Sequence, residues 1–444
     1  MELRDKQVLV VGLARTGIEC ARFLVNQGAK VLVSDLRSET DLEQAIDTLK
    51  GLPIDYLLAG EERRWLEGMD MVVPSPGVPP TNPLLQEATS RGIEILSEIE
   101  VAYRFCRFPI VAVTGTNGKS TTTTLVGEML KANGTKVFIG GNIGAPLIGF
   151  AGDDWEWGVV EISSFQLEWI EEFRPRVAVL LNLSEDHLDR YPDFAAYCRA
   201  KERIFENQKA KDVAVLNRDD PLVWALRQGR PARIVSFGFS EVDEGVFAKP
   251  EEIVWRDASS EQRFPLGHVQ IQGVHNVENM MAAIAVAKAI GVPAQIIQQT
   301  LEEFPGLEHR LEFVREKNGV RYYNDSKGTN VGAVVKSLAS FSAPVILLAG
   351  GVDKGGDYRV LRDGIRKRVK RLVLFGAAKE MIAQALGMLT VTVLVDNMEA
   401  AVRDAHQHAL PGDVVLLSPA CSSFDMFRNY AERGRVFKNL VEAL

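Results

Sequence analysis

The sequence predicts an α/β protein of three domains, each built on a mostly parallel sheet. Its 444 residues are too many for one core, and at roughly 150 residues per domain they divide into about three. Strand-like apolar runs alternate with helical stretches along the chain, which is typical of parallel sheets. Several strands end in loops rich in Gly, Ser, Lys and Asp, and open α/β sheets bind ligands at that edge. We expect domains at 1–98, 99–306 and 307–444.

Composition excludes several classes of protein. A net charge of -8 and a pI near 5.5 argue against a nucleic-acid partner, and we interpret the basic run at 366–371 as a solvated helix face. The four cysteines show no CxxC spacing, so neither a zinc site nor a disulfide framework is expected. Without a cleavable leader or about 18 consecutive apolar residues, no membrane association is expected. The predicted location is the cytoplasm.

The first domain opens with a strand, a glycine turn, a helix and a second strand over residues 7–35. The turn VGLARTG keeps Gly12 and Gly17 but lacks the GxGxxG fingerprint, and Asp35 follows where a ribose-binding acid is expected. A turn without any ligand remains an alternative. The hypothesis of a nicotinamide dehydrogenase would have this incomplete turn as its only support. We therefore expect the turn to bind a nucleotide other than a nicotinamide dinucleotide. A strand end and a proline-rich turn follow at 71–80.

The second domain opens with a strand at 108–115 that enters GTNGKSTTTT, residues 115–124. The usual phosphate-loop spacing needs glycine at 113, where this chain has valine. Even so, Gly-Lys-Ser stands between a strand and a helix, so Lys119 can supply a cation while Ser120 or Thr121 ligates Mg²⁺. The alternative is a glycine turn that only joins two elements. The order of elements favours a nucleoside triphosphate without naming the reaction.

Three more residues of this domain are candidates with structural alternatives. Glu161 ends a buried strand and can complete a Mg²⁺ site, although alone it could equally cap a helix or form an ion pair. His187 follows the next strand, with Asp186 and Asp189 beside it, at the edge of the sheet where the phosphate loop also opens. A lone histidine is more often structural than functional. By composition, Lys201 belongs to a solvated helix face.

The third domain begins after a long helix at 275–291 and a joint at 304–310. Strands are expected at 321–325, 343–351, 371–376 and 413–420. They run into the loops NDSKGTN, AGGVDKGGDY and LSPACSSFDMF, whose residues suit carboxylates and ribose hydroxyls. Ordinary connections can have the same composition.

Taken in order, the motifs resemble those of the Mur ligases, ATP-dependent amide-forming enzymes of peptidoglycan synthesis. The resemblance covers essentially the whole chain, and the third domain looks most like the branch that accepts D-glutamate. It implies a Rossmann-like domain for the UDP substrate, a central P-loop domain for ATP, and a Rossmann-like domain for the amino acid; a monomer is expected. The motifs are GTNGKST, EISSFQLE, LNLSEDHLDRY, HNVENMMAA, FPGLEHR, NDSKGTN and SPACSSFDMFRNYAERGRVF.

The resemblance also implies roles for particular residues. It implies two Mg²⁺ ions, and it gives Lys201 a carbamate that turns a cation into an oxygen ligand. The implied catalytic residues are Lys119, Glu161, His187, Lys201, Arg310 and Lys327. Those for ATP are Gly115, Thr116, Asn117, Gly118, Lys119, Ser120, Thr121, Asn276, Asn279, Arg310 and Asp325. Those for the UDP substrate are Thr16, Asp35, Arg37, Ser75, Gly77 and Asn142, with Leu36 departing from the family's small polar residue. Those for D-glutamate are Thr329, Lys354, Ser423, Phe424 and Tyr430, and those for metal are Ser120, Glu161, His187 and carbamylated Lys201.

The implied reaction joins D-glutamate to UDP-N-acetylmuramoyl-L-alanine through an acyl phosphate, with closure of the third domain before chemistry. Within the same class, another Mur ligase or a folylpolyglutamate synthase is the alternative. From a different class, a nucleotide switch or kinase would keep the phosphate loop. It would have no use for Lys201 or for the loops of the third domain.

Overall fold

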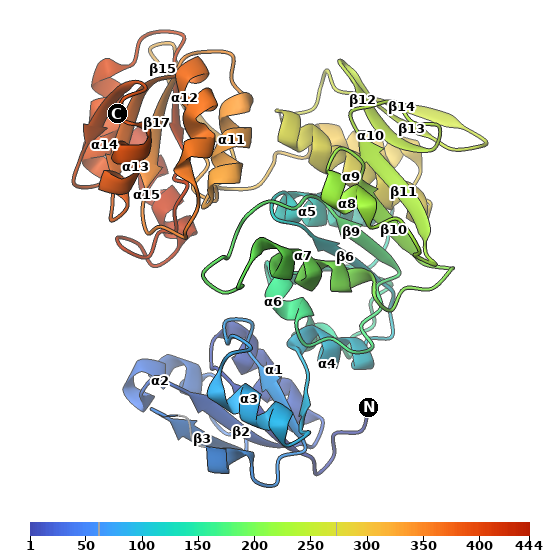
Figure 1. The fold of residues 1–444 in the computed structure, drawn as a ribbon. Coiled ribbons are helices and arrows are strands. Elements are labelled where there is room, and N and C mark those ends of the chain that lie inside the picture. Colours follow the sequence, from blue (N-terminus) through green and yellow to red (C-terminus); the bar gives the residue numbers. More distant parts are fainter. Residues whose placement is uncertain (61–62, 272) are drawn as a thin grey trace.

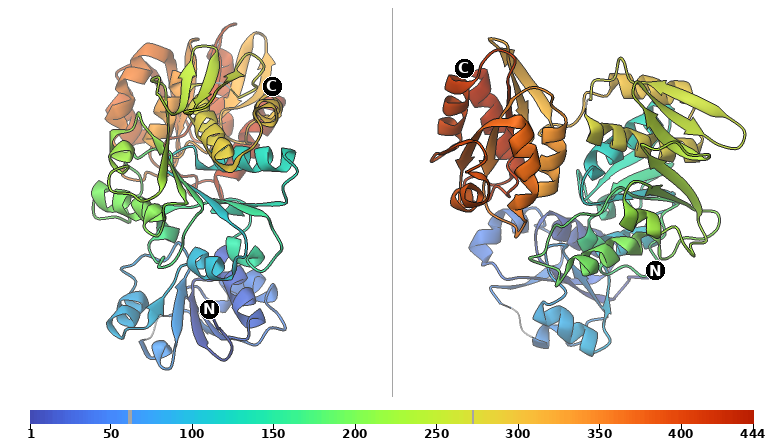
Figure 2. Two further views of the ribbon diagram at one scale, coloured as in Figure 1. Left: turned by 90° about the vertical axis from the view of Figure 1, so that its right-hand side faces the viewer. Right: turned by 45° about the horizontal axis from the view of Figure 1, so that its top comes forward.

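The computed structural model describes residues 1–60, 63–271 and 273–444. They form three α/β domains, each around its own sheet, so the predicted fold class is confirmed. Figure 1 shows the first domain at the bottom, the central domain above it on the right, and the third domain on the left. The two further views in Figure 2 show the same three bodies. Within the described ranges, no helix is long and apolar enough to cross a membrane.

The first domain has a five-stranded parallel sheet in the order β3-β2-β1-β4-β5. The predicted strand, turn, helix and strand at 7–35 are confirmed as β1, α1 and β2. Its strands are β1 (Gln7–Val11), β2 (Lys30–Asp35), β3 (Ile54–Leu58), β4 (Met71–Pro74) and β5 (Glu94–Ile95). Its helices are α1 (Arg15–Asn26), α2 (Glu39–Asp47), η1 (Arg63–Leu66) and α3 (Pro83–Ser90), and α4 (Glu98–Phe105) connects it to the central domain.

The central domain has nine strands in the order β14-β13-β12-β11-β10-β9-β6-β8-β7. Parallel pairing predicted from the alternation holds from β7 to β12, whereas β12, β13 and β14 form an antiparallel arm that the sequence analysis missed. The strands are β6 (Ile110–Thr114), β7 (Val137–Gly141), β8 (Trp157–Glu161), β9 (Val177–Leu180), β10 (Val213–Asn217), β11 (Arg233–Gly238), β12 (Gly245–Lys249), β13 (Glu252–Arg256) and β14 (Glu261–Pro265). The helices are α5 (Lys119–Ala132), η2 (Leu147–Phe150), α6 (Ser164–Leu167), α7 (Phe194–Glu202), η3 (Arg203–Phe205), α8 (Pro221–Ala225), α9 (Val274–Ile290) and α10 (Ala294–Glu303).

The third domain has six strands in the order β15-β16-β20-β17-β18-β19, with only the β15–β16 pair antiparallel. Its strands are β15 (Glu312–Lys317), β16 (Val320–Asn324), β17 (Val345–Gly350), β18 (Val369–Phe375), β19 (Val391–Leu394) and β20 (Val414–Leu417). Its helices are α11 (Val331–Ala339), η4 (Tyr358–Leu361), α12 (Arg362–Arg368), α13 (Lys379–Leu386), α14 (Met398–His408) and α15 (Tyr430–Glu442).

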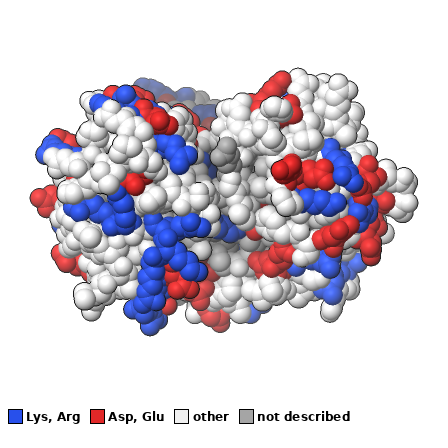
Figure 3. Space-filling model, turned by 90° about the horizontal axis from the view of Figure 1, so that it is seen from above, with Lys and Arg blue, Asp and Glu red and all other residues white. Residues whose placement is uncertain are grey.

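The interpretation of the basic run at 366–371 as a solvated helix face is only partly right. Helix α12 ends at Arg368, so Lys370 and Arg371 belong to β18 and form ion pairs with Asp413 and Asp404. Only the first part of the run is a solvated helix face. Figure 3, which looks down on the molecule, shows Lys and Arg gathered over the half that the third domain forms.

The two junctions between domains differ in composition. One cluster of buried apolar residues runs from the first sheet through α4 into the central sheet, so these two domains share a core. The third domain has clusters of its own on the two faces of its sheet. It meets the central domain largely through polar pairs, among them Lys336 with Glu278 and Asn330 with Asp186.

Candidate active site

The predicted phosphate loop lies between β6 and α5. Gly115 and Gly118 have φ of +148° and +89°, values that favour glycine. A Cβ at Gly118 would lie 2.2 Å from Asn279 Oδ1, so any other residue there would have to displace the Asn279 side chain. Lys119 Nζ curls back and donates to the carbonyls of Gly115 and Thr116, both at 2.8 Å. The loop therefore encloses the Lys119 ammonium at the N-terminus of α5, where an anion is favoured.

Neighbouring side chains brace this loop. Asn182 exchanges two hydrogen bonds with Asn117, accepting at Oδ1 at 2.8 Å and donating from Nδ2 at 3.1 Å. Thr116 donates its amide to the Asn182 carbonyl, and its Oγ1 accepts from the Tyr197 hydroxyl at 3.1 Å. Neither Asn182 nor Tyr197 was predicted. Contacts within the protein thus set the shape of the loop.

Glu161 ends β8 beside the loop and is almost fully buried, as expected from its place in the sequence. Its Oε1 accepts from Asn142 Nδ2 at 2.6 Å, while its Oε2 is buried and has no hydrogen-bond partner among the described residues. An unsatisfied buried carboxylate oxygen is costly unless a donor or a cation meets it. This oxygen is therefore available for a ligand.

Lys201 corrects the composition-based interpretation of α7 as a solvated face. Arg199 is exposed as expected, but Lys201 is only 2% exposed and its Nζ lies 4.8 Å from the centre of the Tyr197 ring. In the described parts of the chain, this amine has no hydrogen bond or ion pair. Burial, together with the nearby Lys119, holds the pKa of Lys201 well below its usual range.

His187 lies at the same edge of the sheet, in the loop after β9. Its backbone has a φ of +56°, and its ring meets the Phe165 ring edge to face at a centroid distance of 4.7 Å. Burial lowers the pKa of His187, aided by Lys354 and Lys201 and opposed by Asp186. The neutral imidazole favoured in this way is the form that ligates metals.

The donors around the loop fit Mg²⁺, although not as a closed protein cage. No group of three or more His, Cys, Asp or Glu side chains that could hold a metal occurs in the part of the chain that the structure describes. The available donors are mixed: the Ser120 hydroxyl, the unpaired Glu161 oxygen and the His187 ring. Because Mg²⁺ prefers oxygen ligands and, in nucleotide sites, completes its shell with phosphates and water, the hydroxyl and the carboxylate suit it, whereas an imidazole is more usual for transition metals.

The third domain reaches the phosphate loop through Lys327. Its Nζ donates to Ser120 Oγ at 2.5 Å and lies 5.5 Å from the centre of the Tyr430 ring. Burial lowers the pKa of Lys327 to about 8, with Arg310 and Lys119 adding to the shift and Glu161 opposing it. Three lysines of two domains, Lys119, Lys201 and Lys327, therefore have lowered pKa values around one carboxylate.

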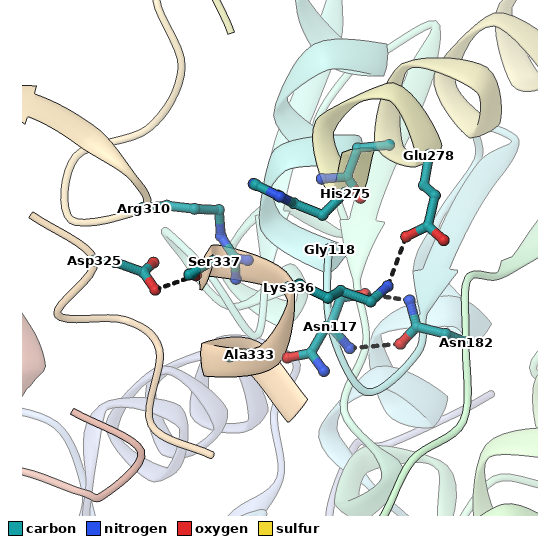
Figure 4. Close-up of a pocket in the computed structure, with 11 residues that line it drawn as sticks. Asn117, Gly118, Asn182, His275, Glu278, Arg310, Asp325, Ala333, Lys336 and Ser337 are labelled. Atoms are coloured by element: carbon teal, nitrogen blue, oxygen red, sulfur yellow. Dashed lines mark hydrogen bonds and ion pairs between the residues drawn. The ribbon is translucent and has the colours of Figure 1, made fainter. Parts of the chain in front are cut away.

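A pocket between the central and third domains brings five predicted ATP residues together (Figure 4). Asp325 accepts from the hydroxyls of Ser337 and Ser418 at 2.6 and 2.7 Å, and burial raises its pKa. The predicted residues lining the pocket are Asn117, Gly118, Asn279, Arg310 and Asp325. His275 and Glu278 of α9 and Lys336 of α11 also line it and were not predicted. Asn276 lines an adjoining cleft with Arg310.

The residues predicted for D-glutamate are spread over several loops. Lys354 lines a cavity of about 450 Å³ with Asp186 and Asn330, and its Nζ lies 3.4 Å from Thr329 Oγ1. Ser423 is buried, whereas Phe424 is 73% exposed. The carbonyl of Tyr430 accepts from Ser326 Oγ at 2.8 Å. The structure thus brings Thr329 and Lys354 together and places Tyr430 beside Lys327 instead.

All six residues predicted for the UDP substrate line one cavity of about 400 Å³ between the first and central domains. They are Thr16, Asp35, Arg37, Ser75, Gly77 and Asn142, and Gln166 joins them without having been predicted. Both oxygens of Asp35 are already engaged, by Arg37 and by the Leu13 amide at 2.8 Å. Against the cost of burial, these bonds lower the pKa of Asp35 to about 2. Asp35 therefore orients Arg37 and the glycine turn.

Comparisons with known proteins match this arrangement domain by domain. The Mur ligase middle domain matches residues 113–287, the Mur ligase MurD-like N-terminal domain residues 6–97, and the Mur ligase glutamate ligase domain residues 309–421. The chain belongs to the Mur ligase family. The resemblance inferred from the motifs is confirmed.

Relatives in this family are similar over their whole length. The UDP-N-acetylmuramoylalanine--D-glutamate ligase of Trichlorobacter lovleyi is 50% identical, with both chains covered completely. Those of Geotalea uraniireducens and Geobacter metallireducens are each 52% identical over 100% of this chain and 99% of theirs.

Solved structures of Mur ligases share the fold. UDP-N-acetylmuramate-alanine ligase from Thermotoga maritima gives a TM-score of 0.61 at 20% identity, covering 99% of both chains. MurF ligase from the same organism, in complex with ADP, gives 0.63 at 18% identity and the same coverage. The pseudomurein peptide ligase type C of Methanothermus fervidus gives 0.63 at 20%, over 99% of this chain and 100% of that one.

Proposed function

We propose that this Mur ligase uses ATP to join the amine of D-glutamate to the alanyl carboxylate of UDP-N-acetylmuramoyl-L-alanine. The observation that carries the proposal is the identity of about 50% over full length to curated D-glutamate ligases. The domains at 1–98, 99–306 and 307–444 would bind the UDP substrate, ATP, and D-glutamate together with part of the ATP. The reaction would serve peptidoglycan precursor synthesis, in the cytoplasm and as a monomer.

In the first step, the alanyl carboxylate attacks the terminal phosphate of ATP and forms an acyl phosphate with release of ADP. Lys119 donates to carbonyls of its own loop, and an arriving phosphate would replace them as acceptor. Arg310 faces the same pocket with an unpaired Nε. These cations offset the charge that gathers on the transferred group.

In the second step, the neutral amine of D-glutamate attacks the acyl carbon, and phosphate leaves after a tetrahedral intermediate. Lys327 is placed to stay with the phosphoryl group, because it already contacts Ser120 at the head of α5. Lys354 and Thr329 would hold one carboxylate of D-glutamate, and Ser423 with the backbone near Tyr430 the other. The position of Lys327 on the third domain makes chemistry depend on that domain being docked.

We propose that two Mg²⁺ ions bind at this site. Ser120, Glu161 and His187 would hold them, and a carbamate on Lys201 would be a further oxygen ligand. When bound, Mg²⁺ neutralises phosphate charge and orients the reacting groups. The structure supports the carbamate in one respect: the lowered pKa of Lys201 raises the fraction of neutral amine, the form that combines with CO₂.

The function is tested with an acceptor panel. With ATP, Mg²⁺ and UDP-N-acetylmuramoyl-L-alanine present, D-glutamate should release inorganic phosphate, and L-glutamate, meso-diaminopimelate or a folate substrate should not. Phosphate release with one of those acceptors, and none with D-glutamate, would indicate a sister ligase. Release that needs no acceptor at all would indicate a nucleotide switch or kinase.

The carbamate is tested by substitution and rescue. Lys201→Ala should lower the turnover number about 100-fold, because it removes a metal ligand. Short carboxylates such as acetate or formate should restore part of the activity by filling the space. Arg199→Ala, on the exposed face of the same helix, is the matched control and should keep full activity. Full activity of the parent enzyme after removal of CO₂ and bicarbonate would contradict the carbamate.

A further inference from the structure

Arg190 joins the first domain to the central domain at the substrate cavity. It stands three residues after His187, and its side chain is only 8% exposed. Its Nη1 donates to the Pro76 carbonyl at 2.9 Å and its Nη2 to the Val78 carbonyl at 3.0 Å. Both carbonyls belong to residues 75–79, here called the substrate loop, which lines the cavity of the UDP substrate.

The other face of Arg190 is fixed by the central domain. Its Nε and Nη2 donate to the two carboxylate oxygens of Glu168 at 3.1 and 2.5 Å. Its guanidinium lies 4.0 Å from the centre of the Phe165 ring. Two carbonyls, a bidentate carboxylate and an aromatic face together need a planar group with several donors, which arginine offers and lysine does not.

From Arg190, contacts lead to both parts of the phosphate site. Phe165 packs against the guanidinium on one side and against the His187 ring on the other, and His187 belongs to the candidate metal site. Glu168 also accepts from the Tyr191 hydroxyl at 2.6 Å, and the Tyr191 ring packs on Tyr197 at 5.6 Å. Tyr197 then donates to Thr116 of the phosphate loop. The two routes share Arg190, and only the second includes Glu168.

The backbone makes a further connection. The amides of Arg190 and Tyr191 both donate to the His187 carbonyl, at 3.0 and 3.1 Å, and close the turn in which His187 has its positive φ. A non-glycine residue in this region is held there only by its surroundings. Displacement of Arg190 therefore disturbs the His187 backbone as well as the ring beside it.

We propose that Arg190 is a positioning residue that couples the substrate loop to the phosphate site, so that the UDP substrate and Mg·ATP each strengthen the other's binding. When the substrate seats the carbonyls of Pro76 and Val78, the guanidinium is fixed over Phe165 and the His187 ring is held for its ligand. Binding coupling of this kind is reciprocal by thermodynamic necessity. The inference rests on the proposed substrates.

The test measures coupling and not only activity. The dissociation constant of a non-hydrolysable ATP analogue with Mg²⁺ is measured by calorimetry, with and without saturating UDP-N-acetylmuramoyl-L-alanine. In the parent protein the substrate should tighten analogue binding at least fivefold. In Arg190→Lys the ratio should fall to below twofold, while each ligand still binds by itself.

Arg104→Lys is the matched control. Arg104 is similarly buried, and it bridges Glu94, Glu100 and Glu171 at the same junction without contacting the substrate loop. Its substitution should leave the coupling ratio unchanged. An equal loss of coupling in both variants would overturn the proposal, because it would report a general loosening of the junction. Unchanged coupling in Arg190→Lys would overturn it too.

A second variant examines the route. Phe165→Leu keeps an apolar side chain but removes the ring between Arg190 and His187, and it should lower the coupling ratio, by no more than Arg190→Lys does, because the route through Glu168 is left intact. The double variant should lose no more than Arg190→Lys alone, because Arg190 lies on both routes. Additive losses would contradict the route through Phe165. If the UDP substrate fails to bind the parent protein, the proposed function fails, independently of Arg190.

Discussion

The two junctions between domains are built from different interactions. The first and central domains share a continuous apolar core, and the connecting helix α4 adds buried hydrogen bonds to it. The central and third domains meet through lysines, glutamates, asparagines and serines around the pocket proposed for ATP. Apolar burial is insensitive to small shifts in salt and ligand, whereas polar pairs exchange readily with water and phosphate. The first junction therefore suits a fixed substrate holder, and the second suits a domain that docks and leaves.

The strongest test of this comparison is Glu100 in α4. This fully buried carboxylate accepts from the amides of Glu171, Glu172 and Phe173 and pairs with Arg104. Glu100→Ala should lower the free energy of unfolding by about 3–5 kcal/mol, because it leaves three amides without their acceptor and removes the buried partner of Arg104, which keeps only Glu94 and Glu171. Thermal or urea unfolding measures the change. Glu172→Ala, an exposed neighbour, should change stability by less than about 0.5 kcal/mol, and equal effects would remove the distinction.

At the polar junction, Lys327→Met should do the opposite: it should cost activity and not stability. The turnover number is expected to fall about 100-fold, because the variant loses the donor that we propose for the transferred group. Below pH 8 the buried ammonium weakens the folded parent protein, since its pKa is about 8 when folded and near 10.5 when unfolded. The unfolded state then binds more protons between those values, so the parent gains stability as pH rises through this window.

The variant should therefore be the more stable protein at pH 7, and its advantage should shrink by up to about 3 kcal/mol toward pH 10.5. Urea unfolding of both proteins at several pH values gives the difference directly. Lys336→Met, a lysine of the same junction that is paired with Glu278, is the control for removing a charge. A stability difference that is constant with pH would show that Lys327 titrates normally.

The smallest effect is expected for Glu278→Gln. Its pair with Lys336 spans α9 and α11 at 2.6 Å, with both side chains partly exposed, and such pairs contribute about 1 kcal/mol or less. The variant should show a slightly larger radius of gyration by small-angle scattering at low salt. The parent should approach the variant as salt is raised, because screening weakens the pair. A salt-independent difference would mean that docking does not depend on this pair.

The sequence was sufficient where one local pattern determined one element. The phosphate loop, α9 with its stop at Gly291, and the strand ends of the three sheets are confirmed because glycine positions and periodicity act locally. Lys201 was misjudged from composition, because its burial is set by tertiary packing: it lies under the Tyr197 ring, and Tyr197 in turn bonds to Thr116 of the phosphate loop. The run at 366–371 was assigned wholly to a helix because its charges gave no sign that the helix ends at Arg368 and a strand begins.

Other parts of the site depend on contacts between distant segments. Arg190 and Tyr197 lie in or near the quoted motifs, but their partners Pro76 and Thr116 are 114 and 81 residues away in the sequence. Gln166 had a usable signal, since Ser163 and Gln166 form a capping box at the start of α6. The antiparallel arm of β12, β13 and β14 had only weak alternation. The roles of the site residues stay predictions until the assays are done.

The contact between Gly118 and Asn279 limits how this protein can evolve. Gly118 cannot readily be replaced, because its φ of +89° is strained for any residue with a Cβ and because that Cβ would lie 2.2 Å from Asn279 Oδ1. A smaller residue in place of Asn279 would relieve the contact but not the backbone strain, and it would remove a side chain that lines the pocket. An alanine at 118 is therefore disfavoured whether or not Asn279 changes with it. Deep mutational scanning of the pair should find almost no viable single change at 118.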